Sequence, residues 1–108
     1  MQAPKIPKAS NAVTVTDSDT TIYKVTSGRT FTAKSVILTN PLTSEARVMI
    51  YDGASSDGRK KLDVIVGAGE TFALGREELY EGVEFKYGDV IGVGSVSGVV
   101  VTIIGEEQ

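Results

Sequence analysis

Cysteine and histidine are both absent from the 108 residues. Without cysteine the chain has no disulfide, no thiol nucleophile and no soft metal ligand. Without histidine it also lacks the commonest general base, and the usual zinc ligands are missing altogether. These two absences exclude most catalytic designs, so we expect a protein that is not an enzyme and uses no cofactor or metal.

Long apolar runs and clusters of positive charge are also missing. The formal net charge is −3, from 11 basic and 14 acidic residues, and no basic cluster is present to neutralise a run of phosphates. No apolar run approaches the ~20 residues that cross a bilayer, and residues 1–10 lack the apolar region of a signal peptide. We therefore expect a soluble protein, made in the cytoplasm, that binds neither nucleic acid nor membrane.

Beta-branched side chains dominate what is present. Val, Ile and Thr account for 33 of the 108 residues, and 12 glycines interrupt them at short intervals. Beta-branched residues fit a pleated sheet better than a helix, and frequent turn residues are typical of many short strands. The pattern predicts an all-β fold, namely an antiparallel β-sandwich or jelly roll of about eight strands.

Three segments give sharper expectations. In the strand predicted over residues 30–40, the apolar alternation slips after Ala33, which indicates a β-bulge or a strand buried on both faces. Residues 76–82 are the segment best suited to a helical turn, with Leu79 plugging the core. Residues 52–58 consist of turn formers and predict an exposed loop.

The chain length fits one domain, with an extension at each end. Residues 1–11 contain two of the three prolines and few large apolar side chains, which predicts an extended N-terminal arm. This arm is either a disordered terminus or a segment ordered by a partner. Residues 12–105 form the predicted β-sandwich domain, and residues 106–108 form an acidic C-terminal tail.

Acidic residues are the remaining candidates for chemistry. Residues 77–84 contain four glutamates. Glycoside hydrolysis needs a pair of carboxylates, but these glutamates fall in a polar stretch where solvated charge is the default. Calcium has two candidate ligand pairs, Asp17 with Asp19 and Asp52 with Asp57. Aspartates next to glycine and serine are also what turns require, and we favour that interpretation at both places.

Tyrosines support an alternative function. The four tyrosines are Tyr23, Tyr51, Tyr80 and Tyr87. Together with the loop of residues 52–60 they would give a module that recognises a surface glycan or receptor. Tyrosines at strand edges more often pack one ring face against the protein and direct the hydroxyl outward.

Turn and strand motifs over residues 22–105 resemble small β-sandwich modules of tailed-phage virion proteins. The motifs are, in order, IYKVTSGRTFTAKSVILTN, ARVMIYDG, VIVGAGETFAL and YGDVIGVGSVSGVVVTIIGEE. The first resembles a strand, a glycine turn and a long strand ending in Thr-Asn. The second is similar to a strand that runs into an exposed loop. The third resembles an apolar-x-x-Gly-Glu-Thr turn, and the fourth resembles the closing hairpin.

This resemblance implies a non-enzymatic structural protein of the virion. Modules of this kind serve as capsid decoration proteins, as head-fibre bases, or as parts of tail and neck proteins. Because the module is nearly the whole chain, the resemblance favours a decoration or cement protein that stabilises the shell by bridging capsid subunits. The implied partners are the major capsid protein and copies of the chain itself, with a homotrimer favoured.

Two parts of the chain are candidate partner-binding sites. The arm supplies Pro4, Lys5, Ile6, Pro7 and Lys8. The arm is not part of the family pattern, so its contact role is inferred from its position alone. Val100 and Ile104 belong to residues 99–104, which have apolar side chains on both faces and therefore form either an ordinary central strand or one covered by a partner.

Overall fold

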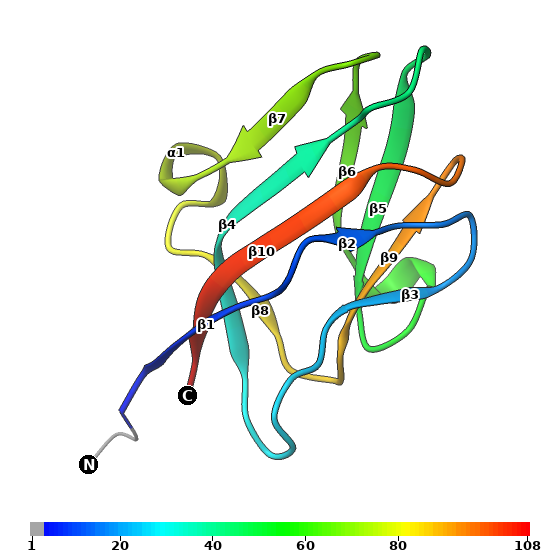
Figure 1. The fold of residues 1–108 in the computed structure, drawn as a ribbon. Coiled ribbons are helices and arrows are strands. Elements are labelled where there is room, and N and C mark those ends of the chain that lie inside the picture. The colour runs from blue at the N-terminus through cyan, green and yellow to red at the C-terminus, as the bar shows by residue number, and fades with distance from the viewer. Residues whose placement is uncertain (1–3) are drawn as a thin grey trace.

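Two antiparallel β-sheets face each other in the computed structural model, which describes residues 4–108 (Figure 1). The six-stranded sheet contains β1 (Ile6–Ala9), β2 (Val13–Thr14), β4 (Phe31–Thr39), β7 (Thr71–Leu74), β8 (Val83–Phe85) and β10 (Val100–Glu107). The four-stranded sheet contains β3 (Thr20–Tyr23), β5 (Ala46–Asp52), β6 (Lys60–Val66) and β9 (Val90–Gly94). The connections include a 3-10 turn η1 (Asp57–Arg59) and a helical turn α1 (Arg76–Leu79). The predicted all-β sandwich is confirmed, with ten strands in place of about eight.

The central strands of the six-stranded sheet are β4 and β10. Strand β10 pairs with β4 over its whole length, and on its other side it pairs with β2 and then with β1. Strand β4 pairs with β8 through its first half and with β7 through its second half. The last strand of the chain is therefore held in place by the first strands, as Figure 1 shows.

One hydrophobic core lies between the two sheets. The largest fully buried apolar side chains are Phe31, Leu38, Ile50, Phe85 and Ile103. They come from strands of both sheets. Successive side chains of a strand point to opposite faces of its sheet, and each strand directs its apolar side chains toward the core. The rings of Phe31 and Phe85 are tilted against each other with centroids 6.2 Å apart.

The phase slip predicted within residues 30–40 is a β-bulge between β4 and β10. Ala33 and Val36 both face the core, although they are three positions apart, and the pairing register shifts between Ile104 and Gly105. Gly105 is required at this point, because a Cβ atom there would lie 2.0 Å from the carbonyl oxygen of Thr32. The two backbones approach too closely for any side chain.

The predicted helical turn is confirmed as α1, and Leu79 is buried as expected. Tyr80 follows it with φ 55° and ψ −117°. Among residues 4–108 it is the one non-glycine residue with a positive φ, and its side chain is 82% exposed. A backbone of this kind costs a non-glycine residue about 1–3 kcal/mol, and core packing does not offset that cost because the ring lies in solvent.

The expected tail at residues 106–108 is wrong. Strand β10 continues through Glu107, whose side chain points into the interior and is fully buried. The arm predicted over residues 1–11 is extended in its described part, but residues 6–9 form β1 against β10 of the same chain. Residues 6–9 and the end of β10 therefore belong to the sandwich itself, and residues 1–3 lie outside the described residues.

The expected exposed loop at residues 52–58 is wrong at its first position. Asp52 is the last residue of β5 and is fully buried. Its carboxylate accepts hydrogen bonds from the backbone N–H groups of Lys86 at 3.0 Å and Tyr87 at 2.9 Å. These charge-assisted bonds satisfy the buried carboxylate, whereas residues 53–58 are exposed as expected.

Replacing Gly105 tests the close approach at the bulge. We expect Gly105→Ala to lower the free energy of unfolding by more than about 2 kcal/mol, because the added methyl group meets backbone that cannot move aside. The matched control is Gly58→Ala, since Gly58 has open space around it and an ordinary φ. Urea unfolding measures both variants, and equal stability of the two would contradict the close approach.

Strain at Tyr80 predicts an inverted preference for glycine. We expect Tyr80→Gly to be more stable than Tyr80→Ala by about 1 kcal/mol, because only glycine adopts this backbone without strain. At Glu77, inside α1, the order should reverse, with alanine more stable than glycine by about 1 kcal/mol. Thermal unfolding of the four variants measures both differences, and the same order at both positions would argue against strain.

Candidate functional site

The outer face of the six-stranded sheet is not covered by any other layer of residues 4–108 (Figure 1). In β10, Val101 and Ile103 point into the core, whereas Val100, Thr102 and Ile104 point to the outer face. Ile104 is 41% exposed. The apolar pattern on both sides of this strand therefore has two causes, a core on one face and an uncovered apolar surface on the other.

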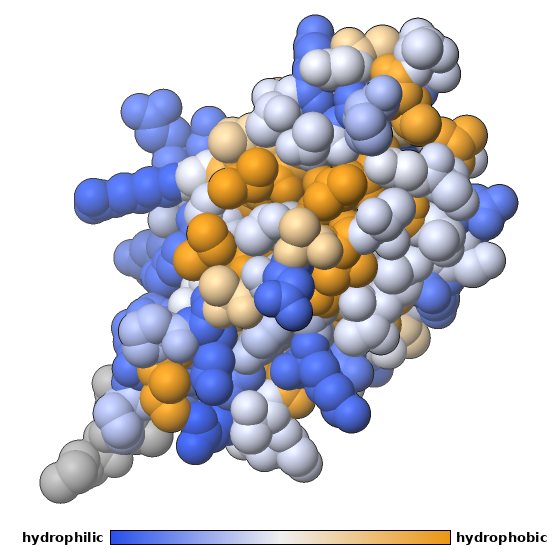
Figure 2. Space-filling view, in the orientation of Figure 1, coloured by the Kyte–Doolittle hydropathy of each residue, from blue (hydrophilic) through white to orange (hydrophobic). Residues whose placement is uncertain are grey.

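Neighbouring strands extend this apolar surface. On β4, Ile37 lies opposite Thr102, and on β7, Ala73 lies opposite Ile37. On β1, Ala9 lies opposite Ile104. Figure 2 shows apolar side chains gathered on this face with less hydrophobic residues between them. We call Ile37, Ala73, Val100, Ile104 and Ala9 the outer patch.

The arm contributes Ala9 to the outer patch and forms one of its borders. Strand β1 pairs antiparallel with the end of β10, and its register places Ile6 opposite Glu107 and Ala9 opposite Ile104. The N–H of Ser10 donates to the carbonyl of Ile103 at 2.8 Å, and the N–H of Ile103 donates to the hydroxyl of Ser10 at 2.9 Å. The structure thus brings the arm and the last strand, predicted separately as partner-binding, to one edge of one sheet.

The predicted arm residues differ in how they are placed. Pro4, Lys5 and Pro7 are exposed, and Ile6 and Lys8 are half-buried. Lys5 lies 3.7 Å from the carboxylate of Glu106.

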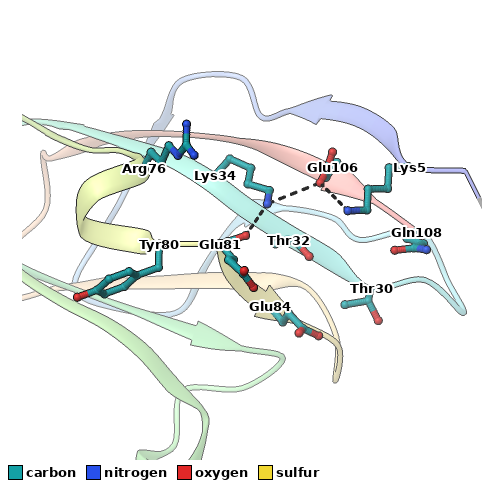
Figure 3. Close-up of a pocket in the computed structure, with 11 residues that line it drawn as sticks. Lys5, Thr30, Thr32, Lys34, Arg76, Tyr80, Glu81, Glu84, Glu106 and Gln108 are labelled. Carbon is teal, nitrogen blue, oxygen red and sulfur yellow. Dashed lines mark hydrogen bonds and ion pairs between the residues drawn. The ribbon is translucent and has the colours of Figure 1, made fainter.

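A polar groove of about 970 Å³ adjoins the arm. Figure 3 shows Lys34 between the carboxylate of Glu106 and the main chain of Glu81, with Lys5 on the other side of Glu106. The Lys34 ammonium lies 3.7 Å from Glu106 and donates to the Glu81 carbonyl. Tyr80 also lines the groove. The groove therefore contains charges of both signs that largely neutralise each other.

A buried carboxylate holds the end of β10 against the other sheet. The hydroxyl of Tyr23, at the end of β3, donates to Oε2 of Glu107, and the N–H of Thr26 donates to the same oxygen at 3.1 Å. Arg29 lies 3.9 Å from Oε1, which has no hydrogen-bond partner among residues 4–108. The contact of Glu107 with Tyr23 joins the two sheets directly.

Ionisation in this cluster follows from its hydrogen bonds. Burial by itself raises the pKa of Glu107, but the hydrogen bonds from Tyr23 and Thr26 and the attraction of Lys8 hold it below its ordinary value. For Tyr23, burial first, then the hydrogen bond to Glu107 and repulsion by its charge, raise the pKa. The cluster is therefore a neutral tyrosine donating to an ionised glutamate at neutral pH.

The acidic candidates are not assembled into a site. The four glutamates of residues 77–84 are all exposed, and the Glu78 carboxylate accepts the N–H of Gly75 at 2.8 Å at the start of α1. Asp17 and Asp19 are exposed, and Asp52 is bonded to backbone donors. Within residues 4–108 no group of three acidic side chains is placed to hold a metal ion.

The tyrosines do not form one platform. Tyr51 is buried and Tyr23 is bonded to Glu107. Tyr80 and Tyr87 are exposed, and Tyr87 is covered by the guanidinium of Arg59 at 4.0 Å from the ring centroid.

No helix among the described residues is long and apolar enough to cross a membrane.

Sequence reasoning missed Ile37, Lys34 and Glu107. Ile37 lies within the strand predicted over residues 30–40, and its alternation with Val36 and Leu38 is the signal that it faces outward. Lys34 and Glu107 gave no such signal, because their contacts involve residues 47 and 84 positions away in the sequence.

Comparison with known proteins supports the fold. No protein family profile and no curated protein sequence matches the chain. A chain from the disulfide-linked pili that Bacillus endospore appendages form has a similar structure, with a TM-score of 0.58 and 13% sequence identity. The similarity covers 100% of this chain and 90% of the pilus chain. It shows a shared all-β fold, and the resemblance to phage virion modules stays a prediction.

Removing the Tyr23 hydroxyl tests the buried cluster. We expect Tyr23→Phe to lower the free energy of unfolding at pH 7 by about 1–3 kcal/mol, because a buried carboxylate loses a donor. The matched control is Tyr87→Phe, at an exposed tyrosine, which should change stability by less than about 0.5 kcal/mol.

The effect of Tyr23→Phe should depend on pH. Because the folded-state pKa of Glu107 is lowered, its ionised form stabilises the fold above the ordinary glutamate pKa of about 4.3. That contribution is lost as the pH falls through the lower folded-state pKa. Urea unfolding at pH 7 and pH 3 should therefore show a smaller difference between Tyr23→Phe and the unchanged chain at pH 3. A difference that grows in acid would contradict this assignment.

Proposed function

We propose that this chain is a non-enzymatic structural subunit that assembles through the outer patch. In its finer form the proposal is a capsid decoration or cement protein of a tailed-phage particle, which stabilises the shell by bridging capsid subunits. The observation that carries the proposal is the outer patch itself, an apolar sheet face that the chain leaves uncovered. Exposed apolar side chains gathered on one face are typical of surfaces that bind another protein.

A copy of the same chain is the first partner. Between Val100 and Ile104 the outer face has apolar and hydroxyl side chains and no charge, so two such faces meet without burying an unpaired ion. At the end of the face, Lys5 and Lys34 flank Glu106, so the cluster offers both signs of charge to a copy of itself. Homo-oligomers of this type usually close by symmetry, and we favour a trimer.

The phage setting rests on the sequence resemblance over residues 22–105. In a phage particle the second partner of this chain is the major capsid protein, and the chain is located in the virion.

A fibre subunit is the second candidate, favoured by the fold shared with a pilus chain. That chain comes from pili that are disulfide-linked, whereas this chain contains no cysteine. Copies of this chain would therefore associate without disulfide bonds between them. Electron microscopy of the concentrated protein distinguishes closed oligomers, expected for the decoration protein, from filaments, expected for the fibre subunit.

Placing a charge on the outer patch tests the proposal. We expect the unchanged chain to form an oligomer in light scattering. Ile104→Lys should raise the dissociation constant of that oligomer at least tenfold, which is about 1.4 kcal/mol, because a lysine is then buried in an apolar contact. The matched control is Ile65→Lys on β6 of the other sheet, where Ile65 is 60% exposed. The control should assemble like the unchanged chain.

Addition to capsids tests the finer form. We expect the unchanged chain to add to the outside of expanded capsids that lack it, and Ile104→Lys to add less. A strict monomer that ignores such capsids would contradict the decoration role.

A further inference from the structure

The arm is separate from the hydrophobic core. The buried core residues begin at Val15, and none of residues 4–12 belongs to the core. Within residues 4–108, strand β1 is an edge strand that pairs with β10 alone. Removing it from β10 therefore leaves the packed interior between the sheets intact.

The edge of β10 that pairs with the arm is complementary to it in backbone pairing and in charge. It offers backbone pairing from Ile104 to Glu107. It also offers negative charge to a positively charged strand, since Lys5 lies 3.7 Å from Glu106 and Lys8 attracts the buried carboxylate of Glu107. A strand edge of this kind binds an extended segment through main-chain hydrogen bonds, and the matching charges select which segment.

The connection between the arm and the sandwich can be rearranged at small cost. Asn11 and Ala12 are exposed and belong to no strand, and β2 after them has only two residues. A change of backbone direction there disturbs no buried side chain. Three residues from Ser10 to Ala12 span up to about 10 Å when extended, which allows the arm to leave its own sheet.

We propose that in the assembled state the arm of each copy pairs with β10 of a second copy, by exchange of β1. This inference rests on the proposed function and adds a contact along the strand edge to the contact between outer patches. Every β1–β10 bond is the same within one chain and between two chains, so exchange costs little beyond the entropy of association. Within one chain the arm has an effective concentration in the millimolar range, so exchange is favoured when copies are crowded at similar concentrations.

Paired cysteines in this cysteine-free chain report where the arm lies. Ala9 and Ile104 are directly opposite each other, and opposite residues of antiparallel strands have Cα separations that suit a disulfide. The double variant Ala9→Cys/Ile104→Cys is oxidised at ~10 μM and at ~1 mM chain, and the products are separated on a non-reducing gel. We expect monomer-sized product when dilute, and at least a fivefold increase in covalently linked dimers and longer chains when concentrated.

The matched control is Ile37→Cys/Thr102→Cys. These two residues are also opposite and lie on the same outer face, but β4 and β10 are central strands that cannot exchange. The control should give monomer-sized product at both concentrations. Linked product from the control alone, or equally from both variants, would assign the links to contact between faces and overturn exchange.

A second measurement uses the unchanged sequence. A sample mixed from ¹³C-labelled and unlabelled chains at ~1 mM should show nuclear Overhauser effects between Ala9 and Ile104 of different copies. Monomer-sized product together with no such effect would overturn exchange. The oligomeric state of the unchanged chain, measured by light scattering, decides the proposed function separately, so an oligomer without exchange leaves that proposal standing.

Discussion

The carboxylate of Glu107 lies where the two sheets meet, and its donors, Tyr23 and Thr26, come from β3 and the turn after it. This interaction holds the last residues of β10 in the interior of the sandwich. Because β10 pairs with β4 on one side and with β1 on the other, the position of the arm depends on it as well. A carboxylate at this depth without donors would be drawn to water, since an unpaired buried charge is costly.

Local patterns in the sequence were sufficient for much of the fold. The abundance of Val, Ile and Thr predicted strands, and the slip after Ala33 located a bulge, because the alternation of side chains leaves a record of any extra residue. Leu79 stood out as one large apolar residue in an acidic segment. Asp52 and Glu107 could not be predicted, because a buried acid is distinguished from a solvated one only by donors that are distant in the sequence.

The candidate surface was predicted only in part, because some of its contacts join residues that are distant in the sequence. Val100 and Ile104 were found because the strand is apolar on both faces, and the structure separates those faces into core and outer patch. The arm was expected to be extended, but pairing between residues 6–9 and 104–107 joins the two ends of the chain. No pattern within either segment specifies that partner. The outer patch also includes Ile37 and Ala73, which become neighbours only through strand register.

Antiparallel pairing of the first and last strands has a mechanical consequence. With Ile6 opposite Glu107, the outer ends of β1 and β10 leave the domain at the same end (Figure 1). A force that pulls these two ends apart breaks the hydrogen bonds one pair after another, as a zipper opens, and needs little load. A force directed along the arm, against a sandwich in which β10 is held by β4, loads all of those bonds together. The edge therefore resists sliding far better than peeling, and its strength depends on the direction of pull.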